Sequence, residues 1–303
     1  MIYNEFKGKK LSALGMGGMR FPTRDGQIDT QKTEEIIDYA IKNGINYFDT
    51  AWGYHEGKSE STLGKLLKKY PRDSFYLASK FPGFDEDKMS RVEEIFEKQL
   101  EKCQVEHFDF YLFHCVCESN IDMYLDRKYG VYDYLLKQKK NGRIKHLGFS
   151  SHANLDNLKR FLEAYGENME FCQLQINYLD WEYQKAKEAV EIVSSYGIPV
   201  WVMEPVRGGK LANLNSVFEK KLRELNPKRT NAEWAFRFIQ GLPEVVVTLS
   251  GMSSLEQIKE NINVFGTQEQ LTESEKEVLF EIGRRMTSKD ALPCTACRYC
   301  IEK

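Results

Sequence analysis

The 303-residue sequence predicts an α/β fold, a (β/α)8 barrel of the TIM type. Eight short runs are apolar on both faces, as buried parallel strands are. Segments with helical periodicity separate most of these runs, which is the alternation of a parallel barrel. The alternative is a doubly wound open sheet, but no Gly-x-Gly-x-x-Gly follows the first run, and "GMGGM" from Gly15 is only a partial match.

The expected strands follow in chain order, after a short N-terminal β-hairpin. They are "LSALGMG" from Leu11, "NYFDTA" from Asn46, "FYLASK" from Phe75, "FDFYLFH" from Phe108, "IKHLGFS" from Ile144, "FCQLQIN" from Phe171, "PVWVME" from Pro199 and "EVVVTLS" from Glu244. We expect residues 1–287 to form the barrel and residues 288–303 to form a separate cysteine-containing tail.

The segments between the strands have the spacing of amphipathic helices. "TEEIIDYAIKNG" places four apolar residues from Ile36 to Ile41 on one face and ends at Asn43-Gly44, a favourable C-cap. Similar periodicity occurs in "SESTLGKLLKKYP" from Ser59, "SRVEEIFEKQLEKC" from Ser90, "LDNLKRFLEAYG" from Leu155, "YQKAKEAVEIVSSYG" from Tyr183 and "ESEKEVLFEIGRRM" from Glu273.

Composition excludes several functional classes. The net charge is −2 and no basic block dominates, so we expect no nucleic-acid partner. No apolar run approaches the ~18 residues of a membrane span, and "MIYNEFKGKK" lacks the apolar stretch of a signal peptide. We therefore expect a cytoplasmic protein with no membrane partner. In such a reducing compartment, Cys103, Cys115, Cys117 and Cys172 are expected to be thiols in apolar surroundings.

Four chemically active side chains stand at or just after strand ends, where barrels of this type carry their active sites. They are Asp49, Tyr54, Lys80 and His114. Each alone has an ordinary structural explanation, but their joint placement favours a catalytic site for reducing a carbonyl group.

The four residues have distinct expected roles. Tyr54 would donate a proton to the developing alkoxide. Lys80 would lower the phenol pKa from its usual value near ~10, and Asp49 would hold Lys80 in place. His114 would orient the substrate carbonyl or relay the proton.

The stretch "GINYFDTAWGYHEGKSESTLGKLL" resembles the signature of the aldo-keto reductases. The later segments "LASK", "FYLFH", "IKHLGFSSH", "FCQLQINYLD" and "VMEPVRGGKLA" occur in the order of that family. The resemblance runs from about Leu11 to about Ile282. It implies a TIM barrel, a nicotinamide cofactor and the tetrad Asp49, Tyr54, Lys80 and His114.

The resemblance also implies which residues hold the cofactor. Ser150, Ser151 and Gln173 stand at the nicotinamide-binding positions, although the family commonly has Asn where this chain has Ser151. Met203 stands where the family often stacks a tyrosine. The remaining expected contacts are Gly18, Met19 and Asp49 near the first strands, Val206, Arg207, Gly208, Gly209 and Lys210 at the pyrophosphate, and Gly251, Met252, Gln257, Glu260 and Asn261 at the adenosine. A polar barrel interior is the alternative explanation for the residues around Gln173.

The sequence gives less information on whether the cofactor is NADP or NAD. Many NADPH-preferring members carry Lys or Arg in the adenosine segment, whereas this chain has Gly251, Met252 and Gln257 at the matching positions. We expect NADP from the habit of the family, with NAD as the alternative.

The C-terminal stretch "PCTACRYCIEK" spaces Cys294, Cys297 and Cys300 by two residues each. This spacing matches the start of the ferredoxin run Cys-x2-Cys-x2-Cys-x3-Cys-Pro. A bacterial branch of the family that resembles this chain continues into a ferredoxin-like [4Fe–4S] segment. We therefore expect a longer native protein that binds such a cluster, incomplete in residues 288–303. A zinc site or three separate thiols are the alternatives.

The leading functional hypothesis is an NAD(P)H-dependent reduction of an aldehyde or ketone to an alcohol. One alternative is a nucleotide-binding redox sensor or regulatory module. Another is an electron-transfer oxidoreductase that uses the tail cluster and an electron-transfer partner. The long segment from His114 to Asp133 is expected to line the pocket for a small-molecule carbonyl substrate.

Overall fold

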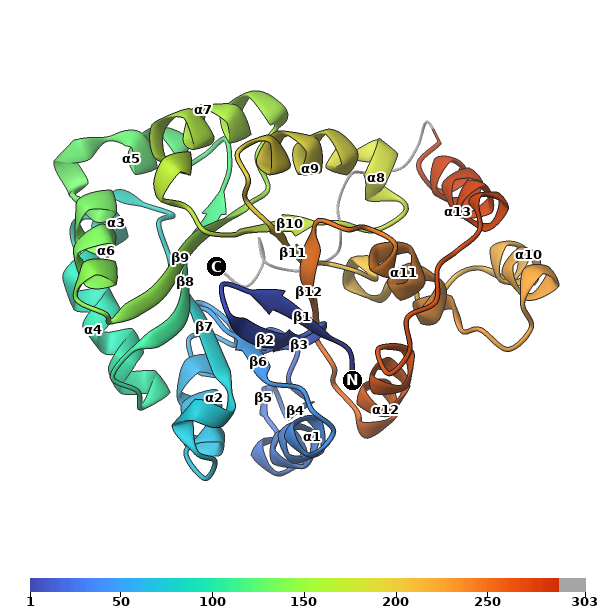
Figure 1. The fold of residues 1–303 in the computed structure, drawn as a ribbon. Coiled ribbons are helices and arrows are strands. Elements are labelled where there is room, and N and C mark those ends of the chain that lie inside the picture. The colour runs from blue at the N-terminus through green and yellow to red at the C-terminus, as the bar shows by residue number, and fades with distance from the viewer. Residues whose placement is uncertain (289–303) are drawn as a thin grey trace.

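The computed structural model describes residues 1–288, in which eight parallel strands close into a barrel (Figure 1). The strands are hydrogen-bonded in the order β10-β11-β12-β3-β6-β7-β8-β9, and β9 returns to β10. This confirms the predicted (β/α)8 fold. The bounds are β3 (Leu14–Gly17), β6 (Tyr47–Asp49), β7 (Tyr76–Phe81), β8 (Phe108–Val116), β9 (Ile144–Ser151), β10 (Cys172–Gln175), β11 (Val200–Met203) and β12 (Val245–Ser250).

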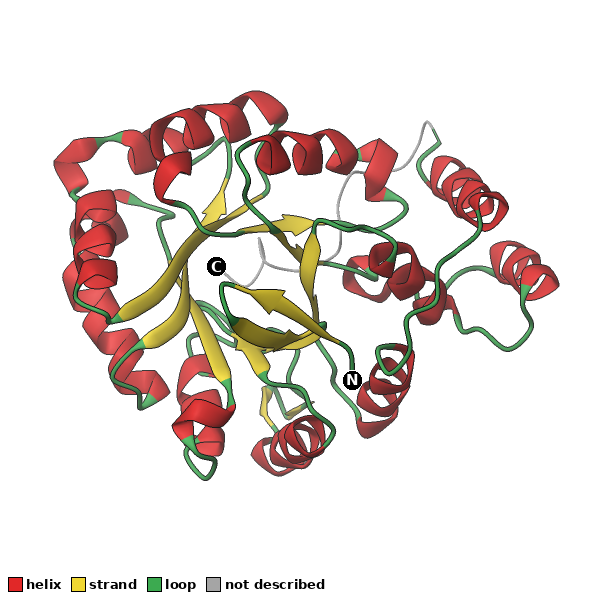
Figure 2. Cartoon of the chain, in the orientation of Figure 1, coloured by secondary structure: helices red, strands yellow, loops and turns green. Residues whose placement is uncertain are grey.

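Helices surround the barrel, as Figure 2 shows in red. The longer ones are α1 (Thr30–Lys42), α2 (Ser59–Leu67), α4 (Val92–Cys103), α6 (Val131–Lys140), α7 (Leu155–Tyr165), α9 (Ala186–Ser195), α10 (Ser216–Leu225), α11 (Asn231–Gln240), α12 (Leu255–Val264) and α13 (Glu273–Met286). Short pieces are α3 (Glu86–Ser90), α5 (Ile121–Leu125), α8 (Asp180–Tyr183), and the 3₁₀ turns η1 (Arg72–Ser74), η2 (Arg127–Tyr129), η3 (Gly166–Asn168) and η4 (Arg207–Gly209). The helix expected from Glu273 begins there because Thr272 and Glu275 form a capping box.

An N-terminal hairpin of β1 (Tyr3–Phe6) and β2 (Lys9–Ser12) lies across the amino-terminal end of the barrel (Figure 1). Its Phe6 ring meets His146 and Trp201 edge-on, with centroids 5.0 and 5.1 Å away. The run expected as one strand from Leu11 is therefore divided between the hairpin and β3. Aromatic packing therefore fills the centre of the barrel at this end. A second, two-residue hairpin pairs β4 (Thr23–Arg24) with β5 (Gln27–Ile28).

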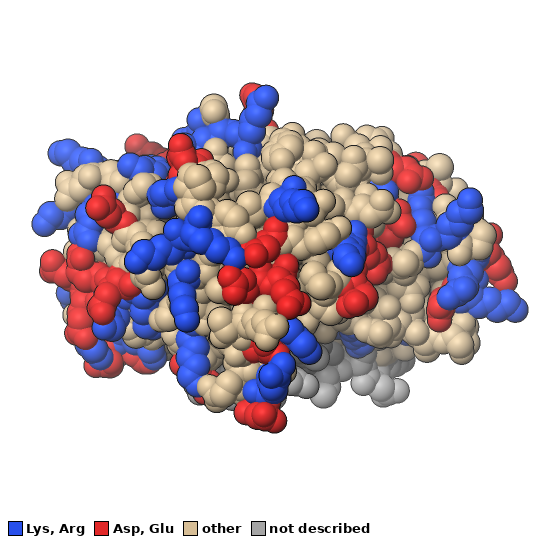
Figure 3. Space-filling view, turned by 90° about the horizontal axis from the view of Figure 1, so that it is seen from below, with Lys and Arg blue, Asp and Glu red and all other residues tan. Residues whose placement is uncertain are grey.

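The face shown in Figure 3 carries interspersed acidic and basic side chains, in keeping with the small net charge. Among the helices of residues 1–288, none has the length and apolar character that crossing a membrane requires. The predicted cysteine ligands Cys294, Cys297 and Cys300, and the tail from residue 289 onward, lie outside the described residues.

One carboxylate ties the hairpin to the barrel. The Oε2 atom of Glu170 lies 2.9 Å from Lys7 Nζ in the hairpin turn and 2.8 Å from His146 Nδ1 in β9. Its Oε1 atom lies 2.5 Å from Lys139 Nζ in α6. Burial by itself would raise the pKa of Glu170. Hydrogen bonds from these three groups outweigh burial and hold that pKa well below its usual 4.5.

We expect Glu170→Gln to lower the melting temperature at neutral pH. A carboxyl group with a depressed folded-state pKa stabilises the fold above its unfolded pKa, and this contribution is lost as the pH falls. The difference in melting temperature between wild type and variant should therefore shrink as the pH falls below about 4.5. Thermal unfolding followed by circular dichroism checks this, with the exposed Glu167→Gln as control. A deficit that stays constant with pH would contradict the assignment.

Candidate active site

The four predicted catalytic side chains meet at the carboxyl ends of adjacent strands. Asp49 is the last residue of β6, Lys80 lies in β7, His114 lies in β8, and Tyr54 lies in the loop between β6 and α2. They are almost fully buried, with 2, 0, 5 and 8% of their surfaces exposed, respectively.

Lys80 makes the central contacts of this group. Its Nζ donates to Asp49 Oδ1 at 2.5 Å, to the carbonyl oxygen of Thr50 at 2.8 Å and to the hydroxyl of Tyr54 at 3.4 Å. Burial lowers the pKa of Lys80 and raises that of Asp49, while the attraction between the two groups opposes both shifts. The pair therefore places a cation directly beside the phenol oxygen.

Tyr54 holds its proton tightly. Burial raises its pKa well above 10, and the negative charge of Asp49 adds to that rise. Arg20 acts in the opposite direction. The net direction is opposite to the one expected from the sequence, because desolvation and the nearby negative charges outweigh the charge of Arg20. Tyr54 is consequently a protonated phenol across the physiological pH range. Its ring meets that of His114 edge-on, with centroids 5.9 Å apart.

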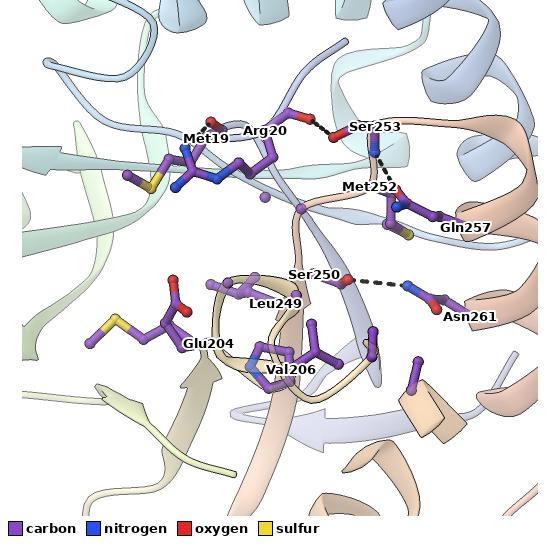
Figure 4. A pocket seen from close by; sticks show the side chains of 18 of the residues that line it. Met19, Arg20, Glu204, Val206, Leu249, Ser250, Met252, Ser253, Gln257 and Asn261 are labelled. Atoms are coloured by element: carbon purple, nitrogen blue, oxygen red, sulfur yellow. Dashed lines mark hydrogen bonds between the residues drawn. The ribbon is translucent and has the colours of Figure 1, made fainter. Parts of the chain in front are cut away.

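A cavity of about 480 Å³ opens beside these residues (Figure 4). Its wall includes Tyr54, Asp49 and His114 but not Lys80, which lies behind Asp49 and Tyr54. Most of the predicted cofactor contacts also line it: Met19, Ser150, Gln173, Met203, Val206, Gly208, Gly209, Gly251, Met252, Gln257, Glu260 and Asn261. The structure thus brings together residues from β6, β8 to β12 and α12.

Two predicted contacts, Gly18 and Ser151, are not among the residues that line the cavity. The Gly18 N–H donates to the carbonyl oxygen of Asp49 at 2.7 Å, and its own carbonyl accepts from Ser59 Oγ at 2.8 Å. The Ser151 hydroxyl donates to the carbonyl oxygen of Val116 at 3.3 Å. Both residues fasten neighbouring segments at the end of the barrel.

Arg207, also a predicted contact, points away from the cavity. Only 1% of it is exposed, and its Nε lies 3.1 Å from both carboxylate oxygens of Asp180. The guanidinium group of Arg207 therefore forms a buried ion pair with Asp180, and this ion pair anchors the loop that carries Gly208 and Gly209. These glycines have φ angles of 63° and 92°, which bring the backbone to the cavity wall. Lys210, the last predicted member of this loop, is exposed and does not line the cavity.

Several cavity residues were not predicted, and Arg20 and Glu204 are the charged ones. Figure 4 shows Arg20 beside Met19 and Glu204 on another wall. Glu204 Oε2 is buried with no hydrogen-bond partner among the described residues, and burial raises the pKa of this carboxyl. Glu204 directly follows β11. Its position at a strand end could therefore have identified it from the sequence as a candidate active-site residue. The unpredicted remainder includes Cys115, His152, Asn213, Thr230, Asn231, Ser250 and Ser253.

The donor and acceptor groups of this wall fit a nicotinamide dinucleotide. Asp49 Oδ2 is buried and has no hydrogen-bond partner within residues 1–288, so it is available to accept from a ligand. Ser150 Oγ accepts from the Cys115 N–H at 2.7 Å, which leaves its hydroxyl hydrogen to donate. Gln173 adds an amide, and the Gly208-Gly209 turn adds close backbone approach.

Comparison with known proteins gives one family. A model of the Aldo/keto reductase family matches residues 13–282. The chain is 25% identical to the uncharacterized oxidoreductase YqkF of Bacillus subtilis, over 89% of this chain and 92% of that protein. It is 24% identical to the NADH-specific methylglyoxal reductase of Escherichia coli, over 83% of this chain and 89% of that protein.

Solved structures agree with this result. The holo form of aldo-keto reductase AKR11C1 from Bacillus halodurans superposes with a TM-score of 0.76 and 26% identity, covering 93% of this chain and 96% of that one. An aldo-keto reductase from Klebsiella pneumoniae, in complex with NADPH, shares the fold with a TM-score of 0.74 at 19% identity, over 93% and 95% of the two chains.

We expect Arg207→Met to destabilise the protein. Removing one member of a buried ion pair leaves the charge of Asp180 uncompensated, at a cost of roughly 3–5 kcal/mol. Lys210→Met is the matched control, because it removes an exposed cation from the same loop. Thermal unfolding should show a much lower melting temperature for the first variant and nearly none of that loss for the second. Equal melting temperatures for the two variants would refute the anchoring role.

Proposed function

The chain belongs to the aldo/keto reductase family and is an NAD(P)H-dependent oxidoreductase that reduces carbonyl groups, and we propose that Tyr54 is its proton donor. The observation that carries this proposal is the contact between Lys80 Nζ and the Tyr54 hydroxyl, inside a buried group that also contains Asp49. A nicotinamide held by the cavity residues would supply the hydride for the carbonyl carbon.

The proton comes from the Tyr54 hydroxyl. Because its pKa is raised by burial, this phenol is loaded with a proton before substrate arrives. An alkoxide is a stronger base than a phenolate, so transfer from Tyr54 to the developing alkoxide oxygen is favourable. The charge left on the phenol oxygen is then stabilised by Lys80 Nζ, 3.4 Å away, which Asp49 keeps in place. We assign His114, at the edge of the Tyr54 ring, the task of orienting the carbonyl oxygen.

We further propose a division of the cavity wall among parts of the cofactor. Ser150 and Gln173 would hold the carboxamide of the nicotinamide by hydrogen bonds, beside the apolar side chain of Met203. The Gly208-Gly209 turn would approach the pyrophosphate through its backbone. The segment from Gly251 to Asn261 would enclose the adenosine. This assignment rests on their common exposure to one cavity.

Tyr54→Phe tests the proton donor. We expect normal folding and cofactor binding, with turnover of aldehydes reduced by about 10²–10⁴-fold because general acid catalysis is lost. Steady-state kinetics and cofactor fluorescence titration measure the two quantities. Tyr178→Phe is the matched control, since its buried hydroxyl has no hydrogen-bond partner among the described residues.

Unchanged turnover in Tyr54→Phe would overturn the role of this residue. A wild-type protein that binds the nucleotide tightly but reduces no member of a carbonyl panel would instead favour a regulatory nucleotide sensor.

We propose NADPH as the preferred reductant. Helix α12 begins next to the cavity residues Ser253 and Gln257, and a helix N-terminus stabilises a phosphate group. The relatives differ in this respect, because one solved neighbour contains NADPH and another relative is named NADH-specific. We expect a higher kcat/KM for NADPH than for NADH when both are varied at saturating aldehyde. A higher value for NADH would reject this preference.

We also propose that Cys294, Cys297 and Cys300 are ligands of a [4Fe–4S] cluster, through which an electron-transfer partner would act. Their spacing is the support for this proposal. No group of three or more metal-binding side chains occurs within residues 1–288.

We expect iron and acid-labile sulfide in protein purified without oxygen, and their loss in Cys297→Ser. Elemental analysis and visible absorption measure both. A protein free of iron, or one that keeps its iron in the variant, would contradict the proposed ligands.

A further inference from the structure

A buried glutamate connects the main chains of Tyr54 and Lys80. Glu60 lies in the first turn of α2 and has no exposed surface. The N–H of Ser59, the residue before it, donates to the carbonyl oxygen of Tyr54 at 3.1 Å. The side chain of Glu60 extends to β7, where its Oε1 accepts from the hydroxyl of Ser79, the residue before Lys80, at 2.6 Å. The start of α2 thus joins the loop of the proposed proton donor to the strand that carries the neighbouring cation.

Gln99 of α4 completes this connection. Its Nε2 donates to Glu60 Oε1 at 2.6 Å and to the main-chain carbonyl oxygen of Lys80 at 3.0 Å. Helices α2 and α4 pack against each other outside β7 (Figure 1). Because side chains alternate along a strand, Ser79 faces these helices while Lys80 faces the inside of the barrel. The hydrogen-bonded pair of Glu60 and Gln99 therefore fixes, from outside the sheet, the peptide from which the Lys80 side chain extends inward.

The second oxygen of Glu60 faces a cation beside the loop of Tyr54. Glu60 Oε2 lies 3.4 Å from Lys102 Nζ, which in turn lies 3.9 Å from the centre of the Trp52 ring. Trp52 and Tyr54 belong to the same loop between β6 and α2. One carboxylate therefore contacts the groups that hold the Lys80 main chain through one oxygen, and a group that packs on the Tyr54 loop through the other.

This network is energetically costly at its position. The same helices and strand bury apolar side chains such as Phe96 of α4 and Leu77 of β7. Burial raises the pKa of Glu60, against the hydrogen bond from Ser79 and the charge of Lys102. Well-packed apolar side chains are often at least as stabilising as a buried ion pair of similar volume, so stability alone does not account for a carboxylate here.

We propose that Glu60 and Gln99 are positioning residues that keep the Lys80 ammonium group within reach of the Tyr54 hydroxyl. The distance between Lys80 Nζ and the Tyr54 hydroxyl is 3.4 Å, which is already long for a hydrogen bond. A small shift of the Lys80 main chain would lengthen it and weaken the stabilisation of the phenolate. Neither Glu60 nor Gln99 lines the cavity, so we expect neither to touch cofactor or substrate. This role rests on the function proposed for Tyr54.

Lys80 is thereby held at both ends of its side chain. Asp49 Oδ1 and the carbonyl oxygen of Thr50 accept from its Nζ at 2.5 and 2.8 Å, which fixes the ammonium group. Gln99 accounts for the other end, because it bonds the carbonyl oxygen of Lys80 itself. The contacts at the ammonium group set its direction, and the contacts at the main chain set how far it reaches into the barrel.

Gln99→Met tests the proposal, because methionine has a similar volume but cannot donate to the Lys80 carbonyl. We expect aldehyde turnover per cofactor-binding site to fall about 10–100-fold, since a small misplacement of a catalytic group has effects of this order. The dissociation constant for NADPH should not change, because Gln99 does not line the cavity. Steady-state kinetics and fluorescence titration measure the two quantities. Counting turnover per binding site corrects for lost stability, which we expect because the Tyr111 hydroxyl loses its acceptor on Gln99.

Gln138→Met is the matched control. It removes another buried glutamine of a barrel helix, whose side chain accepts from Arg143 at 3.3 Å. Its turnover per cofactor-binding site should equal that of the wild type.

A double variant separates positioning from a purely structural role. In a Tyr54→Phe background, Gln99→Met should lower turnover by no more than about twofold, because the hydroxyl that Lys80 serves is already absent. A loss as large as in the wild-type background would overturn the positioning role, and so would unchanged turnover in Gln99→Met itself. If Tyr54→Phe alone keeps full turnover, the proposed proton donor fails and the positioning role fails with it.

Glu60→Gln provides a second variant if Gln99→Met does not fold, as judged by circular dichroism. It keeps the volume of Glu60 and one acceptor oxygen but removes the charge that faces Lys102. We expect lower turnover with unchanged affinity for NADPH, and again little further loss in the Tyr54→Phe background. Full additivity of the two losses, or unchanged turnover in Glu60→Gln, would overturn the role of Glu60.

Discussion

The ion pair between Lys80 and Asp49 is the interaction around which this end of the barrel is arranged. An ammonium group with no exposed surface is strongly unfavourable unless a carboxylate and further acceptors surround it. The carboxyl end of β6 supplies those acceptors to Lys80 of the adjacent strand β7, because Asp49 Oδ1 and the Thr50 carbonyl oxygen lie within 2.8 Å of the lysine nitrogen. The closed sheet holds both strands in register, so the fold itself fixes where the positive charge lies.

The same burial that makes the ion pair necessary also determines the state of Tyr54. Removal from water favours the neutral phenol over the phenolate, and the charge of Asp49 adds to that preference. The phenol nevertheless touches the ammonium that would stabilise its conjugate base. In the proposed role of Tyr54, this arrangement would keep the phenol protonated before the reaction and would stabilise the phenolate that forms when the proton is transferred.

Much of this architecture follows from local sequence patterns. Eight doubly apolar runs became the eight barrel strands because a sheet covered by helices requires apolar residues on both faces. For the first run, only the carboxyl-terminal part, β3, belongs to the barrel as predicted. Its amino-terminal part pairs with β1 in the hairpin, since Phe6 fills the end of the barrel through contacts with residues from distant strands such as Trp201. Contacts between residues so far apart in the chain cannot be recognised from the pattern of neighbouring residues.

The sequence by itself determined the order of the strands and the gathering of Asp49, Tyr54, Lys80 and His114, because parallel strands in a barrel bring their carboxyl ends to one face. Only the tertiary structure decided which way each remaining side chain points. Arg207 turns to Asp180, Ser151 to a neighbouring carbonyl, and Glu204 to the cavity. The direction in which the pKa of Tyr54 is shifted was likewise decided there. The physical reason is that desolvation and hydrogen bonding depend on groups brought close by folding, which a motif of adjacent residues does not specify.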